Sequence, residues 1–386
     1  MAAGAALILG WARSAVAAHG GAYARLDPHE IAAPVVQGLL ARTGLPAKAV
    51  DAVVVGNALG AGGNPARMVA LASGLDDACA AYSVDSQCCA GLDAVGLAVG
   101  LVRSGQAAIV LAGGVEGWSR APIRAVRPMQ DGEPARPYER PPFSPDPARD
   151  PDLLEAAARH AWDRGHSRAE QDAYALQSHA RAVAHQDDLA HEIVPVAGLG
   201  HDSYPRVIAP TRAARIRAVA RLAEVDPEGR TALTPLAISA KADGAAFIAV
   251  GDEAAFRRLG LAPRAAWLTQ AGTGGDPAMP LLAAELATRK VLARAELPFS
   301  RLEAVELHDA FATQGLGYCR SLGIEPGQIN RRGGGLARGH PIGASGAIAL
   351  VRVLADLQRD GARGALGLVA IAGAGGIGSA ALVSRL

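Results

Sequence analysis

Short apolar runs alternate with longer alanine-rich stretches at both ends of the chain. Strand-like runs at 49–57 and 107–116 flank a helix-like stretch at 88–105, and a similar alternation fills the chain from about 264 onward. Strands that alternate with helices predict a layered α/β fold. Because the two stretches have similar length and order, we expect a duplicated core rather than two unrelated α/β domains.

This alternation stops after Trp118. Residues 119–150 are dense in proline, arginine and aspartate, which predicts an irregular excursion from the core. A helix is expected next, because Ser167 and Glu170 have the spacing of a capping box. We therefore divide the chain into an N-terminal core half (1–118), an insertion (119–245) whose end rejoins that half, and a C-terminal core half (246–386).

The apolar start of the chain could be a signal peptide or an opening strand. Its apolar stretch is short, no basic residue precedes it, and Arg13 follows directly. We therefore favour a strand at 5–10. No apolar run reaches the roughly 18 residues that a membrane helix needs.

Charge and composition argue against nucleic acid or a membrane as partner. Lys plus Arg (38) nearly equals Asp plus Glu (37), and aromatic residues make up 4% of the chain, so neither attraction to polyanions nor base stacking is favoured. The four cysteines, at 79, 88, 89 and 319, form neither a disulfide framework nor a zinc-ligand pattern. Reduced thiols fit a cytoplasmic protein.

Cys88 follows a strand-like run and a polar turn, and it precedes the alanine-rich helix. A position at a helix N-terminus should lower the pKa of its thiol, through the helix dipole and free backbone N–H groups. A thiolate there could attack a thioester. The alternative is a buried structural cysteine, a role that we expect for Cys89 because adjacent helix residues point about 100° apart.

Three further segments could supply a site. His340 lies among glycines, and the following Pro341 restricts its backbone conformation. Such a segment lets the backbone approach a ligand closely while it presents one imidazole. His308 and Asp309 end an apolar strand, where ligand crevices form in α/β sheets, although a core histidine and a helix-capping aspartate are alternatives. The glycine-rich stretch 370–380 resembles a backbone oxyanion site, and a tight turn between packed elements is the alternative.

Together these segments resemble the thiolase superfamily from end to end and in the family's order. The stretches that carry the likeness are GNPAR (63–67), SVDSQCCAG (83–91), GGVEGWSRAP (113–122), RAEQDAYALQSHARA (168–182), HEIVPV (191–196), HDAFA (308–312) and GGGLARGHPIGASGA (333–347). HDAFA stands where most thiolases have Asn-Glu-Ala-Phe, and histidine occurs there in the sterol-carrier-type branch. The resemblance implies an acetyl-CoA acetyltransferase or 3-ketoacyl-CoA thiolase-like enzyme.

That resemblance implies a duplicated βαβαβαββ core in a layered α/β/α arrangement with a loop-domain insertion. It implies that Cys88 carries the acyl group, that His340 is the general base and that His308 donates to an oxyanion. Backbone donors would come from Ala374 and Gly376. The enzyme would catalyse thiolysis or Claisen condensation.

The resemblance also implies how the substrate is held. Ser239 would touch the pantetheine arm, and Arg217 and Arg221 in the insertion would meet the phosphates of coenzyme A, although solvated arginines are an equal alternative. A coenzyme A thioester would be a substrate, with no metal and no permanently bound cofactor. The likeness further implies a homodimer or homotetramer, with room for an accessory subunit.

One departure from the family concerns its second catalytic cysteine. Thiolases end on Cys-x-Gly-Gly-Gly-x-Gly, and the matching position here is Ala372. Alanine cannot transfer the α-proton, and Cys319 lies in a helix expected to leave the site. Three readings follow: a thiolase with a replacement base, a decarboxylating or non-CoA-acceptor acyltransferase that uses Cys88, His308 and His340, and a non-catalytic acyl-CoA-binding scaffold.

Overall fold

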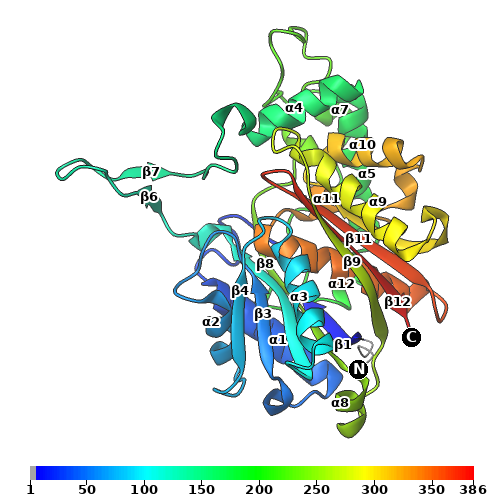
Figure 1. Cartoon of the computed structure of the whole chain (residues 1–386). Coiled ribbons are helices and arrows are strands. Elements are labelled where there is room, and N and C mark those ends of the chain that lie inside the picture. The colour runs from blue at the N-terminus through cyan, green and yellow to red at the C-terminus, as the bar shows by residue number, and fades with distance from the viewer. Residues whose placement is uncertain (1–5) are drawn as a thin grey trace.

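The computed structural model describes residues 6–386, and Figure 1 shows their arrangement. The strands are β1 (Ala6–Arg13), β2 (Ala17–Ala18), β3 (Ala52–Gly56), β4 (Ala80–Val84), β5 (Ile109–Gly117), β6 (Arg124–Val126), β7 (Arg136–Tyr138), β8 (Ala242–Asp252), β9 (Ala265–Gly274), β10 (Leu302–His308), β11 (Leu366–Gly373) and β12 (Ile377–Arg385). The helices are α1 (Pro28–Thr43), α2 (Pro65–Ala72), α3 (Ala90–Arg103), α4 (Leu153–Arg164), α5 (Arg168–Ala184), α6 (Gln186–Ala190), α7 (Pro210–Ala213), α8 (Glu253–Arg258), α9 (Ala283–Ala295), α10 (Ala312–Leu322), α11 (Gly335–Arg338) and α12 (Ile342–Asp360).

The strand order confirms a layered α/β fold and makes the expected duplication visible. The main sheet runs β10-β11-β12-β9-β1-β8-β5-β3-β4. Its two halves match in strand order and direction. In the N-terminal half β3 pairs parallel with β5, while β5–β8 and β8–β1 are antiparallel. In the C-terminal half β10 likewise pairs parallel with β11, while β11–β12 and β12–β9 are antiparallel. The C-terminal half lacks a counterpart of β4, since the loop before α12 takes its place.

This duplication relates the two candidate segments of the site. Cys88 precedes α3 in the N-terminal half, and His340 precedes α12 at the equivalent place in the C-terminal half. The ends of β3 and β10 are likewise equivalent, which pairs Gly56 with His308 as the last residues of their strands. Two copies of one unit therefore bring their corresponding strand and helix ends to one site.

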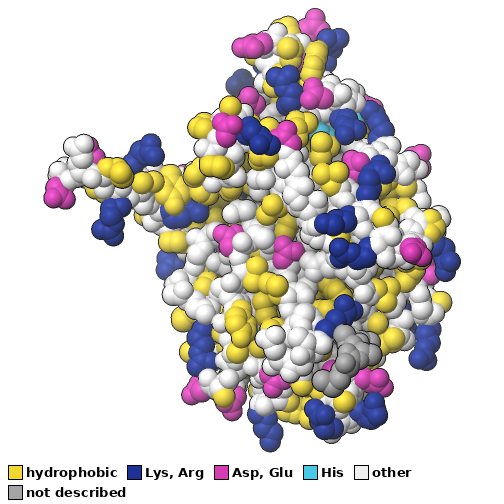
Figure 2. Space-filling view, in the orientation of Figure 1, with side chains coloured by type: hydrophobic (Ala, Val, Ile, Leu, Met, Phe, Trp, Pro, Cys, Tyr) yellow, Lys and Arg dark blue, Asp and Glu magenta, His cyan; other side chains and the backbone are white. Residues whose placement is uncertain are grey.

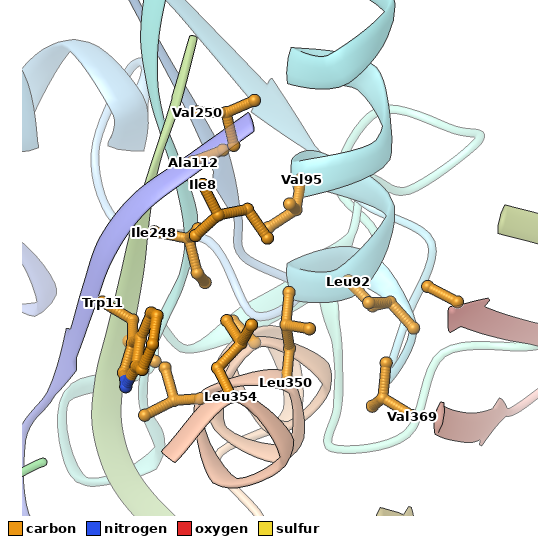
Figure 3. Close-up of a cluster of buried hydrophobic side chains, with 14 of the residues drawn as sticks. Ile8, Trp11, Leu92, Val95, Ala112, Ile248, Val250, Leu350, Leu354 and Val369 are labelled. Carbon is orange, nitrogen blue, oxygen red and sulfur yellow. The ribbon is translucent and has the colours of Figure 1, made fainter. Parts of the chain in front are cut away.

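Helices α3 and α12 lie at the centre of the molecule, as Figure 3 shows for the side chains around them. Leu92 and Val95 of α3 and Leu350 of α12 belong to one buried cluster that also includes strand residues from both halves. Strands β1, β5 and β8 are buried along almost their whole length, because α1 covers their other face. Such two-sided burial explains why these strands read as continuous apolar runs.

The insertion forms a helical layer and a projecting arm. The predicted capping box of α5 is present, with Ser167 and Glu170 bonded reciprocally. Residues expected to be irregular include a hairpin, β6 paired with β7, which extends away from the body in Figure 1 and carries exposed apolar and basic side chains in Figure 2. Ile123 and Met129 on this arm are 95% and 96% exposed.

The proposed division of the chain remains a prediction. Strand β8 spans the boundary placed after residue 245 and pairs with β1 and β5, so its whole length belongs with the N-terminal sheet. None of the helices in the described range 6–386 has the length and apolarity to span a membrane.

A buried network of charged side chains ties the insertion to the core. Arg13 on β1 bonds Glu192 at 2.6 Å and Asp202 at 2.7 Å. Arg352 on α12 pairs with the same Glu192 and bonds Asp356 at 2.6 Å. All five side chains are at most 8% exposed, so each charge depends on its partners rather than on water.

Candidate active site

Cys88 lies in the turn between β4 and α3, one residue before the residue that caps that helix. Gln87 holds this turn in the left-handed region with φ 54°, and its backbone N–H donates to Asp85 Oδ1 at 2.8 Å. A non-glycine residue in this region is strained and is typical of functional sites. The predicted position at a helix N-terminus is therefore correct.

His340 faces the Cys88 thiol with a defined tautomer. The distance from Cys88 Sγ to His340 Nε2 is 3.1 Å, and His340 Nδ1 lies 2.7 Å from Ser345 Oγ. Because the Ser345 hydroxyl donates its hydrogen to the Pro341 carbonyl at 3.0 Å, it accepts from Nδ1–H. The lone pair of the neutral imidazole is thus on Nε2, where it can accept the thiol proton.

The backbone around His340 is fixed on several sides. Its N–H donates to the Ala240 carbonyl at 2.7 Å, and its carbonyl accepts from Trp118 Nε1 at 3.1 Å. The buried carboxylate of Glu116 accepts from the Gly343 N–H at 2.9 Å, an anion at the N-terminus of α12. These contacts fix the backbone that carries the imidazole, and no charged side chain of the described residues bonds to the ring nitrogens, which face Cys88 and Ser345.

Burial sets the protonation of both groups. It raises the pKa of Cys88 to about 12, although backbone N–H groups of Ala374 and of Cys88 itself act in the opposite direction. It lowers the pKa of His340 to about 4. The expectation of a low thiol pKa is therefore wrong, because loss of water outweighs the helix terminus. At neutral pH the pair is a thiol beside a neutral imidazole.

This protonation predicts a flat pH profile for the reaction of Cys88. Since the pKa of His340 is lowered, its basic form is present above about pH 4 and would be lost only as the pH falls through that value. The rate of covalent labelling of Cys88, measured by quenched mass spectrometry from pH 5 to 9, should change little. A profile that rises with an inflection near the ordinary imidazole value of about 6.5 would contradict it.

His308 packs against His340 from the end of β10. The two ring centroids are 4.4 Å apart, and His308 Nε2 is buried without a hydrogen-bond partner among the described residues. Burial, together with His340 and Arg338, lowers its pKa well below the usual range, which keeps it neutral. An unpartnered buried polar atom costs about 1–3 kcal/mol, so a hydrogen bond to this nitrogen would be favourable.

Asp309 does not cap the following helix, which was the alternative role considered from the sequence. Its carboxylate accepts from the Tyr174 hydroxyl at 3.0 Å and from the Leu336 N–H at 3.3 Å, while Phe311 occupies the N-cap of α10. Asp309 therefore fastens α5 and the loop before His340 to the end of β10. Cys89 and Cys319 are buried core cysteines, as predicted.

Cys88 and His340 open into a cavity of about 390 Å³. Apolar side chains form most of its wall, with charged side chains toward the insertion and the arm. Its lining includes Leu59, Trp118, Arg124, Glu139, Arg140, Phe143, Asp152, Leu154, Ile238, Ser239, Lys241, Leu281, Phe311, Ile342, Ala372, Gly373 and Ala374. No cluster of side chains within residues 6–386 is arranged to hold a metal ion.

Comparison with known families is decisive at this point. Residues 6–254 match the model of the thiolase N-terminal domain, and residues 261–385 match that of the thiolase C-terminal domain. The chain belongs to the thiolase family. It is an acyltransferase of the thiolase type.

Relatives of this thiolase cover nearly its whole length. A Bacillus subtilis protein named for acetyl-CoA C-acetyltransferase activity is 34% identical over 360 residues, 93% of each chain. An Escherichia coli protein named for acetyl-CoA acetyltransferase activity is 33% identical over 96% of this chain and 97% of its own. The Bacillus anthracis acetyl-CoA acetyltransferase covers 100% of both chains with TM-score 0.90 and 28% identity. A thiolase of Ascaris suum, solved with coenzyme A, has TM-score 0.89 and 26% identity over 99% of this chain and 100% of its own.

The residues predicted to bind coenzyme A and the second predicted backbone donor differ in how they lie relative to the cavity. Ser239 lines the cavity, although its hydroxyl donates to the Gly335 carbonyl at 2.6 Å. Arg217 and Arg221 are exposed, and Arg221 lines an adjoining groove of about 710 Å³ that shares Asp152 with the cavity. Gly376 is not in the cavity lining. It lies in the β11–β12 turn, and its carbonyl accepts from the Gly275 N–H at 2.7 Å.

Three residues around the site escaped the sequence reasoning. Trp118 and Ser345 fix the backbone and tautomer of His340, and the Lys241 ammonium lies 4.4 Å from the centre of the Trp118 ring. Ser345 could have been found, because it falls in the first turn of the helix that follows His340. The other two are distant in sequence and carried no local signal.

Proposed function

We propose that this thiolase carries its acyl group on Cys88 and takes it from a coenzyme A thioester with His340 as general base. The observation that supports this most is the 3.1 Å contact between Cys88 Sγ and the free lone pair of His340 Nε2. The thiol proton passes to Nε2 as sulfur attacks the thioester carbonyl. The tetrahedral intermediate then expels the coenzyme A thiolate, which takes that proton from His340.

The oxyanion of this step would be held by backbone donors. The N–H groups of Cys88 and Ala374 already face the sulfur closely enough to lower its pKa, and both belong to the tight turns that end at the cavity. Donors fixed before the reaction stabilise developing charge without reorganisation. We assign Ala374, rather than Gly376, as the backbone donor from the glycine-rich turn.

His308 would assist the thioester that enters second. It stands in the HDAFA block, which resembles that of the sterol-carrier-type branch, and its unpartnered Nε2 lies beside His340. Since His308 is buried behind His340 and is absent from the cavity wall, we assign it to a water-mediated contact with a carbonyl oxygen.

Coenzyme A would enter between the arm and the helical layer of the insertion. Lys241, Arg124 and Arg140 surround the cavity mouth, and the adjoining groove leads toward Arg221. Ser239 would line the path of the pantetheine arm, while Arg217 lies nearby in sequence on the exposed surface. We also propose a homodimer or homotetramer, which the family resemblance implies and which light scattering would test.

Acyl loading tests the proposal directly. Incubation with acetyl-CoA or longer acyl-CoA should release about one coenzyme A per chain and add one acyl mass to the peptide that contains Cys88, measured by intact and peptide mass spectrometry. Cys88→Ala should abolish both signals. Cys89→Ala is the matched control, because the side chain of this buried neighbour contacts a backbone carbonyl rather than the cavity. Acyl loading that survives in Cys88→Ala would refute the assignment of Cys88. Absence of any acyl adduct on the wild-type protein would favour a binding scaffold.

A further inference from the structure

Ala372 lies where a condensation on the acyl-enzyme would need a second proton acceptor. It lies near the end of β11, lines the cavity, and precedes Ala374, whose N–H faces the Cys88 sulfur, by two residues. To join a second thioester to the acyl group, its α-carbon must become a carbanion. A methyl side chain cannot remove the α-proton.

No other side chain in the cavity wall replaces that acceptor. Glu139 and Asp152 are exposed, and Asp152 caps α4 by accepting from the Leu154 N–H at 2.8 Å. Lys241 is also exposed and lies over Trp118. The carboxylates therefore lie at the mouth, while the wall around Cys88 offers no thiol or carboxylate.

His340 and His308 do not fill this gap either. Both ring nitrogens of His340 are already engaged, since Nδ1 meets Ser345 Oγ and Nε2 faces Cys88 Sγ. His308 packs behind His340 and is absent from the cavity wall. Neither ring therefore presents a free nitrogen to an α-carbon in the cavity.

We propose that the thioester entering second carries a carboxylate on its α-carbon, as malonyl thioesters do, and that loss of carbon dioxide generates the carbanion. This rests on the proposed acyl-Cys88. The electron pair of the bond to the carboxylate becomes the enolate of the thioester. The enolate carbon attacks the acyl carbonyl on Cys88, and the Cys88 thiolate leaves and takes one proton that reaches it from water through His340. The products are a 3-ketoacyl thioester, carbon dioxide and the free thiol.

The wall of the cavity suits this step. Leu59, Phe311 and Ile342 line the cavity into which the thiol opens, and apolar surroundings disfavour a carboxylate relative to neutral carbon dioxide. The enolate spreads its charge onto the thioester oxygen, which a water molecule would connect to the unpartnered Nε2 of His308. Ala372 leaves this wall free of a competing thiol.

The test compares two second substrates on the same acyl-enzyme. Enzyme acylated from acetyl-CoA receives either malonyl-CoA labelled in its free carboxylate or more acetyl-CoA. We expect one labelled carbon dioxide per acetoacetyl-CoA with malonyl-CoA, and a condensation rate lower by about 10²–10⁴-fold with acetyl-CoA, the usual contribution of general base catalysis. Ala372→Cys should gain at least about tenfold in the acetyl-CoA reaction, whereas Ala372→Ser, similar in size but not a base, should not.

The outcomes separate this proposal from the previous one. Wild-type enzyme that condenses acetyl-CoA as fast as malonyl-CoA would overturn it, and so would acyl-Cys88 that forms normally but yields no carbon dioxide and no acetoacetyl-CoA from malonyl-CoA. Failure of Cys88 to become acylated would instead refute the acyl-enzyme itself.

Discussion

His340→Gln should slow acylation of Cys88 by about 10²–10⁴-fold, the usual contribution of a general base. Burial raises the pKa of the Cys88 thiol to about 12, so almost no thiolate exists at neutral pH without an acceptor for its proton. Glutamine keeps polar atoms at the position but cannot take that proton. The measurement is the rate of coenzyme A release in the first turnover, followed by rapid mixing with acyl-CoA.

Two comparisons make this result specific. Ser345→Ala removes the acceptor that holds His340 Nδ1–H, and we expect a smaller loss, about tenfold, because the base remains but its tautomer is no longer fixed. His201→Gln changes an exposed histidine and should leave the rate unchanged. A His340→Gln rate within a factor of three of wild type would show that the thiol is activated by another route.

Glu192→Ala should lower the free energy of unfolding by about 3–5 kcal/mol. Glu192 is the shared partner of Arg13 and Arg352, and the side chains of all three are at most 1% exposed. Removing the carboxylate leaves two buried guanidinium groups that retain only Asp202 and Asp356. The effect should therefore far exceed that of a single surface charge.

Glu253→Ala provides the matched comparison. Its partner Arg257 lies 3.2 Å away on one exposed helix face, with side chains 71% and 74% exposed, and such pairs contribute at most about 1 kcal/mol. Urea unfolding followed by circular dichroism would report both variants. Equal, small effects would mean that the buried arginines find water or other partners when Glu192 is absent.

The sequence was most informative where structure is local. The opening strand, the capping box of Ser167 and Glu170, and the position of Cys88 at a helix start follow from neighbouring residues, and the structure confirms each. The first residue of the predicted strand 5–10 lies outside the described residues, so that strand is confirmed from Ala6 onward. His340 was found because glycines and Pro341 mark its loop. The order of strands and helices also predicted the duplicated α/β core.

Features that depend on distant contacts could not be predicted in this way. Arg13 meets Glu192 and Asp202, which lie 179 and 189 positions away. The Cys88 pKa was misjudged for the same reason, because the helix terminus is visible in the sequence while the burial that outweighs it is not. The family resemblance implied both Ala374 and Gly376 as donors, and which N–H faces the sulfur depends on the path of the turn, which the sequence does not show.

Helices α3 and α12 touch through glycine, and this sets how far apart their first residues lie. A Cβ placed on Gly91 would come within 2.6 Å of the Gly343 carbonyl oxygen, and one on Gly346 within 2.8 Å of the Leu92 Cβ. Cys88 and His340 stand at the starts of these two helices, so the spacing of their backbones fixes the gap across which the proton moves. Attempts to stabilise this enzyme against heat by filling its centre with larger side chains would widen that gap, so robustness would be gained at the expense of turnover.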